Sequence, residues 1–363
     1  MLLVDPRQGQ RAPHRPKTAV HDCQWIQRLH RLGLLSAAFR PEAKIRVWRS
    51  DQRHRTTLIE DASRPLQRIE KALEQMHVTL TEGVSDSTGV TGMRLVRAMG
   101  QGERAPKALA KLRHHRCKER RATIAQALQG TWQPEPLFAL RQSLELYDSS
   151  HQQIRDCDRV IEAHLQGMAL PEVTPLEPPR RVRRRTDNAA TFDARQRLHH
   201  GAGVDLTAIE GIEESTALVV VREIGTDMRR WPSEKHVGSW LGLAPNPRQS
   251  GGKVTSSATR PGVHRAAQAL RFAAKHLQRS RSALGAFFRR IAARRGLAKA
   301  ITATAYTLAR IVYALLKYGT AYVTQGLEAY ATASRERVVR QVKRQAMELG
   351  LVVGEREAVA QPS

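Results

Sequence analysis

Residues 241–253 read LGLAPNPRQSGGK, and the rest of the chain is organised around this stretch. Its prolines and glycines predict a tight, exposed turn. Gly251 and Gly252 would let the backbone approach a ligand closely and offer unshielded amides. Ser250 lies between Arg248 and Lys253, and cations beside a serine suit attack on a phosphodiester because they offset charge building on the phosphoryl oxygens. The alternative is a plain glycine turn whose serine caps the next segment.

Composition bounds the class of protein. The chain has 363 residues, with 60 Lys and Arg against 34 Asp and Glu, and a pI near 11.1. Such a charge predicts a polyanionic partner, nucleic acid first and an anionic membrane second. Three cysteines at no ligand spacing indicate a reduced cytosolic protein without a zinc site. The most apolar region, 301–323, is interrupted by Arg310 and Lys317, which argues against a membrane span. We therefore expect a cytoplasmic, nucleoid-associated protein.

The N-terminal region, 1–40, starts with a short apolar strand at residues 2–4. A helix follows, and Thr18 is predicted to be its N-cap. A lone strand has unpaired edges on both sides, so this region is interpreted as the tail end of a larger sheet.

Residues 41–168 predict long helices. Apolar residues recur three and four positions apart in two seams: Ile59, Ala62, Leu66, Ile69, Leu73, Met76 and Leu80, then Leu137, Leu140, Leu144, Tyr147, His151, Ile154, Asp158, Ile161, Leu165 and Met168. This spacing is typical of a coiled coil, within one chain or between chains. Polar His151 and Asp158 would set its register. A glycine-rich turn at 83–92 and a basic helical tract over 109–128 lie between the seams. We expect an antiparallel helical hairpin that serves as a spacer or dimer arm.

Residues 169–203 predict a stiff, basic linker. After several prolines, the linker carries Arg180, Arg181, Arg183, Arg184 and Arg185. The run is either a solvated hinge or a phosphate-binding arm, and five arginines in six positions favour the arm. Each phosphate that it neutralises would add about −0.9 to the salt slope of duplex binding.

The last folded region, 204–350, predicts a compact helical domain, followed by a flexible tail at 351–363. A short helix, a hairpin at Gly211 and a second helix form a helix-hairpin-helix pattern, which meets phosphates without reading sequence. Glu213 replaces the usual second hairpin glycine, so simple helix packing is an equal alternative. Stripes in 266–277 and 301–315 predict core helices.

Several motifs occur in one order and carry a resemblance. They are Lys17-Thr18 with Asp22, the turn Ser85-Asp86 to Met93, the Gly211 hairpin with Glu223-Ile224-Gly225, the stretch 241–253, Thr259-Arg260-Pro261-Gly262-Val263, and 298–305. The chain resembles bacterial insertion-sequence transposases of the "IS one-ten" type over nearly its whole length.

The resemblance implies a ribonuclease-H-like domain with four acidic residues and Mg²⁺, a coiled-coil insertion, and a transposase domain whose serine forms a phosphoseryl link to DNA. It further implies a structured guide RNA and a homo-oligomer, dimer or tetramer, held through coiled coils. On this resemblance Ser250 is the nucleophile and Asp22 a metal ligand. The implied nucleic-acid contacts are the linker arginines and Gly211, Arg248, Gly251, Gly252, Lys253 and Arg260.

The chain also departs from that pattern. It begins after the positions of the first two acids, and Ala19 stands where the pair that includes Asp22 has its other acid. The expected fold class is therefore mainly α with a small α/β part: a truncated ribonuclease-H-like remnant, a long coiled-coil insertion and a helical C-terminal domain with a helix-hairpin-helix-like element.

Three functions remain open from the sequence. The first is an RNA-guided serine transposase that cleaves and rejoins DNA, with activity impaired by the missing acids. The second is a catalytically dead remnant that binds nucleic acid and regulates an intact transposase. The third is a basic coiled-coil RNA-binding protein, which leaves the motifs of 241–262 without a purpose.

Overall fold

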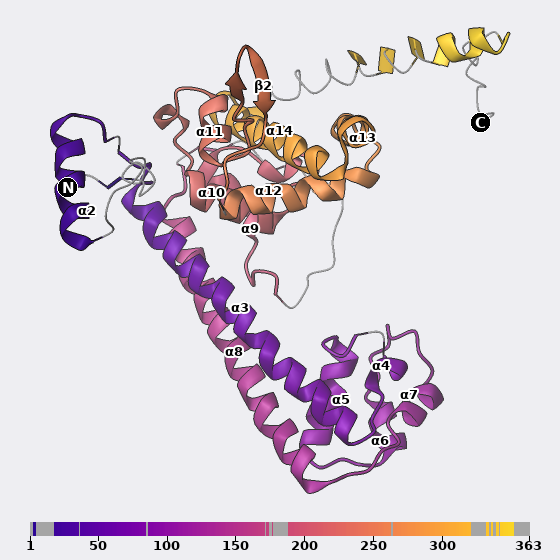
Figure 1. Cartoon of the computed structure of the whole chain (residues 1–363). Coiled ribbons are helices and arrows are strands. Elements are labelled where there is room, and N and C mark those ends of the chain that lie inside the picture. Colours follow the sequence, from indigo (N-terminus) through magenta and orange to yellow (C-terminus); the bar gives the residue numbers. More distant parts are fainter. Residues whose placement is uncertain are drawn as a thin grey trace.

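The computed structural model describes residues 3–4, 18–35, 37–84, 86–170, 172–173, 176, 188–262, 264–320, 332–333, 335–336, 339–340 and 342–351. Within these residues the chain is mostly helical, as predicted, and its one sheet is a two-stranded hairpin. Figure 1 shows an N-terminal helix, a long pair of helices with a small head at the far end, and a C-terminal helical domain. We call these parts the N-terminal helix, the shaft, the head and the C-terminal domain.

The elements follow one another in chain order. The N-terminal helix is α2 (Ala19–Arg31), and the shaft consists of α3 (Ala43–Gln75) and α8 (Pro134–Gln166). The head contains α4 (Leu80–Gly83), α5 (Val90–Gly100), α6 (Pro106–Lys111) and α7 (Arg121–Ala127). The C-terminal domain contains α9 (Ala194–Ala202), η1 (Leu206–Ala208), α10 (Glu214–Ile224), η2 (Met228–Arg230), α11 (Glu234–Trp240), β1 (Arg248–Ser250), β2 (Lys253–Ser256), α12 (Arg265–His276), η3 (Leu277–Arg279), α13 (Ala283–Arg295) and α14 (Leu297–Tyr318).

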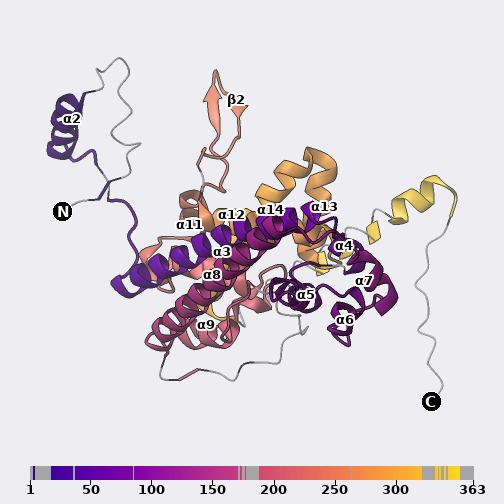
Figure 2. The ribbon, with the colours of Figure 1, turned by 90° about the horizontal axis from the view of Figure 1, so that it is seen from below.

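The shaft is an antiparallel helical hairpin within one chain (Figures 1 and 2). Asp51 bonds His164 near one end, and Arg55 bonds Asp158 one turn further along. The predicted seams face each other, and their buried members include Ala62, Ile69, Leu73, Leu140, Ile154 and Ile161. Asp158 is buried as well, and its partner Arg55 supplies the opposite charge. The structure thus assigns the predicted seams to packing inside the chain.

The head has a small core of its own. Its buried residues include Val78, Leu95, Met99, Leu109, Ile124 and Leu128. The predicted helical tract over 109–128 is wrong as a single helix, because α6 ends at Lys111 and α7 begins only at Arg121. Between them the Arg113 guanidinium donates to the carbonyl oxygens of Cys117 and Glu119, which holds the backbone in a loop.

Two glycines allow neighbouring backbone segments of the head to pack tightly against each other. A Cβ on Gly92 would lie 2.2 Å from the carbonyl oxygen of Ser87, and one on Gly130 would lie 2.3 Å from that of Met76. Both neighbours are backbone atoms, which cannot move aside cheaply. The glycine-rich turn predicted at 83–92 therefore permits close packing where α5 begins.

The C-terminal domain is built around α14, which packs against α11, α12 and α13 (Figure 1). The stripe predicted on α14 is confirmed, since Ala305, Leu308, Val312 and Leu315 are buried. The linker is shorter than the predicted range of 169–203. Residues 194–202 form α9, whose Ala194 and Leu198 belong to the domain core, so their apolar surface is buried there. The arginine run 180–185 lies outside the described residues.

The N-terminal region has the predicted helix start. Thr18 caps α2, and its hydroxyl accepts from the backbone N–H of His21 at 3.3 Å. Val4 forms an isolated antiparallel bridge with Ala37. The sheet of a ribonuclease-H-like remnant is not seen in the described part of this region, so that assignment stays a prediction. Val20, Ile26, Leu32 and Leu34 are exposed.

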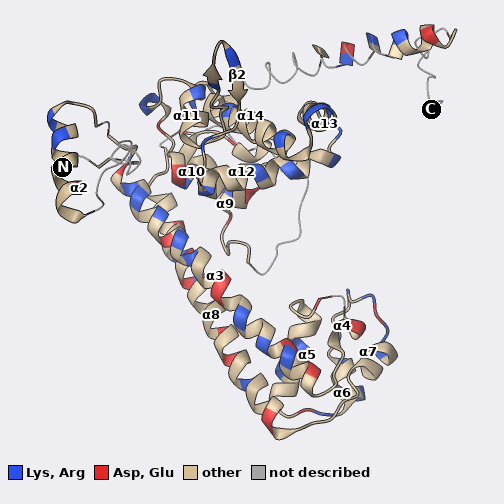
Figure 3. Ribbon diagram, viewed as in Figure 1, with Lys and Arg blue, Asp and Glu red and all other residues tan. Residues whose placement is uncertain are grey.

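Positive charge is spread over the whole molecule. Figure 3 shows Lys and Arg on the shaft, the head and the C-terminal domain, with fewer acidic residues between them. Among the described residues, no helix is long and apolar enough to cross a membrane. In the described residues, the basic side chains are therefore not confined to one part of the chain.

Candidate functional site

The stretch 241–253 leads from the end of α11 into a β-hairpin, β1 and β2, that stands out from the C-terminal domain (Figures 1 and 2). Buried Leu241 and Leu243 anchor its base. β1 pairs with β2 in antiparallel register, and Gly251 and Gly252 connect them with φ of +55° and +75°. Positive φ at both central residues is the geometry of a type I′ turn, whose twist matches that of the strands. The predicted tight, exposed turn is confirmed. The two strands that flank it were not predicted from the sequence.

Ser250 is the last residue of β1 and is exposed. Its cross-strand partner is Lys253, next to the two-residue turn. Directly opposed residues project on the same face, with Cβ atoms about 4.5–5.5 Å apart. The hairpin therefore sets a lysine beside the serine. Among the described residues, none forms a hydrogen bond with the Ser250 hydroxyl.

The other two predicted cations also lie on this projection. Arg248 begins β1 at an irregularity in the ladder, where its carbonyl accepts from the Thr255 hydroxyl at 3.0 Å. Arg260 follows the strand that leaves the hairpin, after a bridge between Pro245 and Thr259. Both side chains are exposed. The structure thus places Arg248 and Lys253 on the same hairpin as Ser250, and Arg260 at the base of that hairpin.

An aromatic cluster supports the base of the hairpin. The ring of Trp240 lies 4.2 Å from that of His264, and Trp231 lies 5.2 Å from Trp240. Phe39, from the segment before the shaft, packs 4.3 Å from Trp231. Burial lowers the pKa of His264, although the carboxylate of Glu223 opposes that shift. The sequence showed these aromatics, but their spacing gave no sign that they meet.

Beside this cluster the shaft joins α10 through arginines. Arg53 Nη2 lies 2.9 Å from both carboxylate oxygens of Glu223, and Arg49 donates to the carbonyl oxygens of Arg222 and Glu223. Arg222 is buried, and burial lowers its pKa to about 10. Glu223, part of one of the motifs quoted above, therefore holds the shaft to the C-terminal domain.

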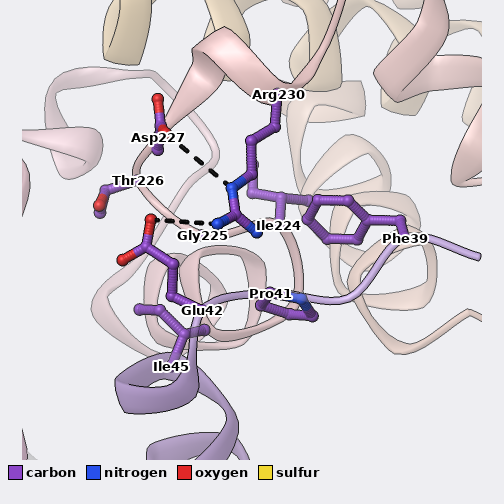
Figure 4. Close-up of a pocket in the computed structure, with 9 residues that line it drawn as sticks. All are labelled: Phe39, Pro41, Glu42, Ile45, Ile224, Gly225, Thr226, Asp227 and Arg230. Carbon is purple, nitrogen blue, oxygen red and sulfur yellow. Dashed lines mark ion pairs between the residues drawn. The ribbon is translucent and has the colours of Figure 1, made fainter. Parts of the chain in front are cut away.

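A small cavity lies at the same junction (Figure 4). It is lined by residues on both sides of the joint: Phe39, Pro41, Glu42, Ile45, Ile224, Gly225, Thr226, Asp227 and Arg230. Arg230 reaches toward Glu42 at 3.7 Å and Asp227 at 3.9 Å. The cavity measures about 10 Å³, which is room for no more than about one water molecule. It is a packing gap and not a substrate site.

The structure does not bring Asp22 to the hairpin. Asp22 lies in the first turn of α2, and α2 and the hairpin are apart in both views (Figures 1 and 2). The described residues contain no group of three or more His, Cys, Asp or Glu placed to hold a metal ion. Magnesium prefers several oxygen ligands, with one or two carboxylates among them. Asp22 is therefore not placed beside Ser250 in this structure, and a Mg²⁺ site stays a prediction.

Gly211 has the backbone of a hairpin glycine, with φ of +89°. A Cβ there would meet Leu277 at 3.0 Å and the carbonyl oxygen of Ala273 at 3.2 Å. The glycine thus allows the turn before α10 to pack on α12. This observation supports the packing alternative, and a phosphate contact at Gly211 stays a prediction.

Comparison with known proteins gives one positive finding. Residues 205–289, from the start of η1 into α13, match the family described as Transposase IS116/IS110/IS902 family. The matched segment contains the whole hairpin and the aromatic cluster's Trp231, Trp240 and His264. No curated protein matches the chain. The resemblance drawn from the motifs is thereby confirmed for this segment, which matches the IS116/IS110/IS902 transposase family.

Proposed function

We propose that this chain is a transposase that cleaves and rejoins DNA through Ser250. The observation that carries the proposal is the position of Ser250 in the matched domain, on an exposed type I′ hairpin with Lys253 opposite. Family membership supports a DNA partner, and the excess of Lys and Arg supports binding to its phosphates.

The proposed step is an exchange of one phosphate ester for another. Ser250 Oγ forms a bond to phosphorus, the bond from phosphorus to the leaving deoxyribose oxygen breaks, and a proton passes from the serine to that oxygen by way of a base. Lys253 and Arg248 would stabilise the charge on the non-bridging oxygens as it develops. Because the ester is conserved, the phosphoseryl link retains the energy needed to rejoin DNA.

The test is capture of that link. Full-length protein is mixed with DNA carrying ends of its own element, denatured, digested with nuclease and examined for a phosphodeoxynucleotide on the peptide that contains Ser250. We expect the adduct in the wild type and its loss in Ser250→Ala. Ser257→Ala is the matched control, because Ser257 is an exposed serine just beyond β2, and it should retain the adduct. An adduct that survives Ser250→Ala would refute the assignment.

A second function is favoured by a separate observation. Asp22 lies apart from the hairpin, and the described acids form no metal cluster. We propose as the alternative that the chain binds nucleic acid without cutting it and regulates an intact enzyme. Absence of the adduct together with DNA binding would support this alternative. The implied Mg²⁺, guide RNA and oligomer stay predictions for both functions.

A further inference from the structure

The head carries a strongly basic loop that the proposed function does not use. Residues 111–121 read KLRHHRCKERR, with six Lys and Arg and a single acidic residue, Glu119. We call these residues the distal basic loop. Of the six cations, Lys111, Arg116, Lys118, Arg120 and Arg121 are exposed. Lys107 and Arg104, also exposed, lie just before the loop.

Hydrogen bonds within the distal basic loop and to α5 hold its backbone. Arg113, the one cation that is half-buried, donates to the carbonyl oxygens of Cys117 at 3.1 Å and Glu119 at 2.6 Å. The His114 N–H donates to the hydroxyl of Thr91 in α5, and the Cys117 N–H donates to the His114 carbonyl. One arginine thus orders the loop, and the other cations are displayed from it.

The displayed cations of the loop are not paired with acidic side chains in the part of the chain that the structure describes. Among the residues that the structure describes, none of the five exposed cations of the loop forms an ion pair. By contrast Arg97, at the end of α5 that packs on the shaft, pairs with Asp148 at 2.7 Å. Concentrated, uncompensated positive charge on an ordered loop matches the regular negative charge of a phosphate backbone.

The loop is far from the candidate nucleophile. α3 has 33 residues, which at 1.5 Å per residue makes the shaft about 50 Å long. The head lies at one end of the shaft and the hairpin domain at the other (Figure 1). At about 3.4 Å per base step, that length corresponds to about 15 base pairs of duplex. A duplex longer than about 15 base pairs is therefore long enough to span the shaft from the C-terminal domain to the head.

We propose that the distal basic loop is a second DNA contact, which binds backbone phosphates of duplex flanking the site where Ser250 acts. This proposal rests on the proposed function only for its choice of DNA as the polyanion. The contact is independent of sequence, because exposed arginines and lysines on a loop meet phosphates without reading base edges. The shaft then acts as a spacer that fixes the separation between the two contacts.

The test is the salt dependence of DNA binding. Lys118, Arg120 and Arg121 are changed to Gln in one triple variant of the full chain. The matched control is Arg64→Gln, Arg155→Gln and Arg159→Gln, which removes the same charge from exposed positions midway along the shaft. Binding of a 40-base-pair duplex is measured by fluorescence anisotropy from 50 to 200 mM salt, and circular dichroism verifies that both variants are folded.

We expect the slope of log K against log salt to fall in magnitude by about 2.7 in the loop variant, at about 0.9 per lost phosphate contact. Over the fourfold change in salt, this difference alters the affinity ratio of wild type to variant by about 40-fold. The control should keep the wild-type slope. Equal slopes in wild type and loop variant, or equal losses in the loop variant and the control, would overturn the proposal.

A second arm separates DNA from RNA. The same titrations with a structured RNA hairpin should show a smaller change of slope for the loop variant than the duplex shows. A change confined to RNA would overturn the assignment to DNA. Failure of the Ser250 adduct would refute the proposed chemistry and leave this result standing, since anisotropy measures binding alone.

Discussion

Removal of the buried Asp158 carboxylate should weaken the joint between the shaft and the C-terminal domain. The loss of stability should be larger than that caused by removing an exposed charge. Asp158 is 1% exposed and accepts from Arg55 through both oxygens, at 2.5 and 3.2 Å. It also accepts from the backbone N–H of Thr191, and Arg55 donates to the carbonyl of Asn188. One buried pair therefore ties α3, α8 and the chain entering α9.

The expected cost of Asp158→Ala is about 3–5 kcal/mol, because the change leaves the buried Arg55 charge without its carboxylate. Arg97 and Asp148 provide the matched control: their pair joins the head to the shaft with side chains 46% and 47% exposed. Asp148→Ala should cost no more than about 1 kcal/mol. The double change Arg55→Met with Asp158→Leu should recover most of the loss, because no unpaired charge remains.

The assay is urea unfolding followed by circular dichroism, with amide hydrogen exchange of peptides from 150–166 to report on α8 itself. Two measurements are needed because the head and the C-terminal domain have separate cores and the chain need not unfold in one step. The reasoning is refuted if Asp158→Ala and Asp148→Ala cost the same, or if the double variant is less stable than Asp158→Ala.

Two further predictions concern the head and the hairpin base. Gly92→Ala should destabilise the head, because its Cβ would lie 2.2 Å from the Ser87 carbonyl oxygen, whereas the Cβ of Gly100→Ala in the same helix would meet side chains at ordinary contact distances, Leu144 at 3.4 Å and Arg141 at 4.0 Å. Thermal unfolding should show a loss for the first and no loss for the second, and equal effects would contradict the close packing. Because burial lowers the pKa of His264, the unfolded chain takes up a proton more readily, so stability should fall as the pH drops below about 6.5. Each unit of lowering is worth about 1.4 kcal/mol, and unfolding midpoints from pH 7 to 5 should decline less in His264→Gln. A decline of the same size in that variant would exclude the contribution of His264.

The structure shows which helices the predicted coiled-coil seams bring together. The seams at 59–80 and 137–168 left open whether they meet within a chain or between chains. The bonds from Asp51 and Arg55 to α8 answer that question for this hairpin.

The elements that the sequence determined are those with local causes. Heptad spacing predicts that the shaft is helical, since residues three and four apart share a helix face whatever the chain does elsewhere. It does not give the bounds of α3, because the predicted seam begins at Ile59 and ends at Leu80, whereas α3 is Ala43–Gln75. Gly251 and Gly252 predict the exposed turn, because positive φ at two neighbouring residues is a local demand. Thr18 predicts the start of α2 for the same kind of reason.

Only the tertiary structure decided the features that join distant residues. Arg53 and Glu223, Phe39 and Trp231, and Arg55 and Asp158 are far apart in the chain, and no spacing rule relates them. The helix α9 inside the predicted linker forms because Ala194 and Leu198 find a core to fill, which a proline- and arginine-rich composition does not reveal. The tertiary structure likewise set Asp22 apart from Ser250 and the distal basic loop at the far end of the shaft. Local rules determine which elements form, whereas long-range packing determines which of them meet.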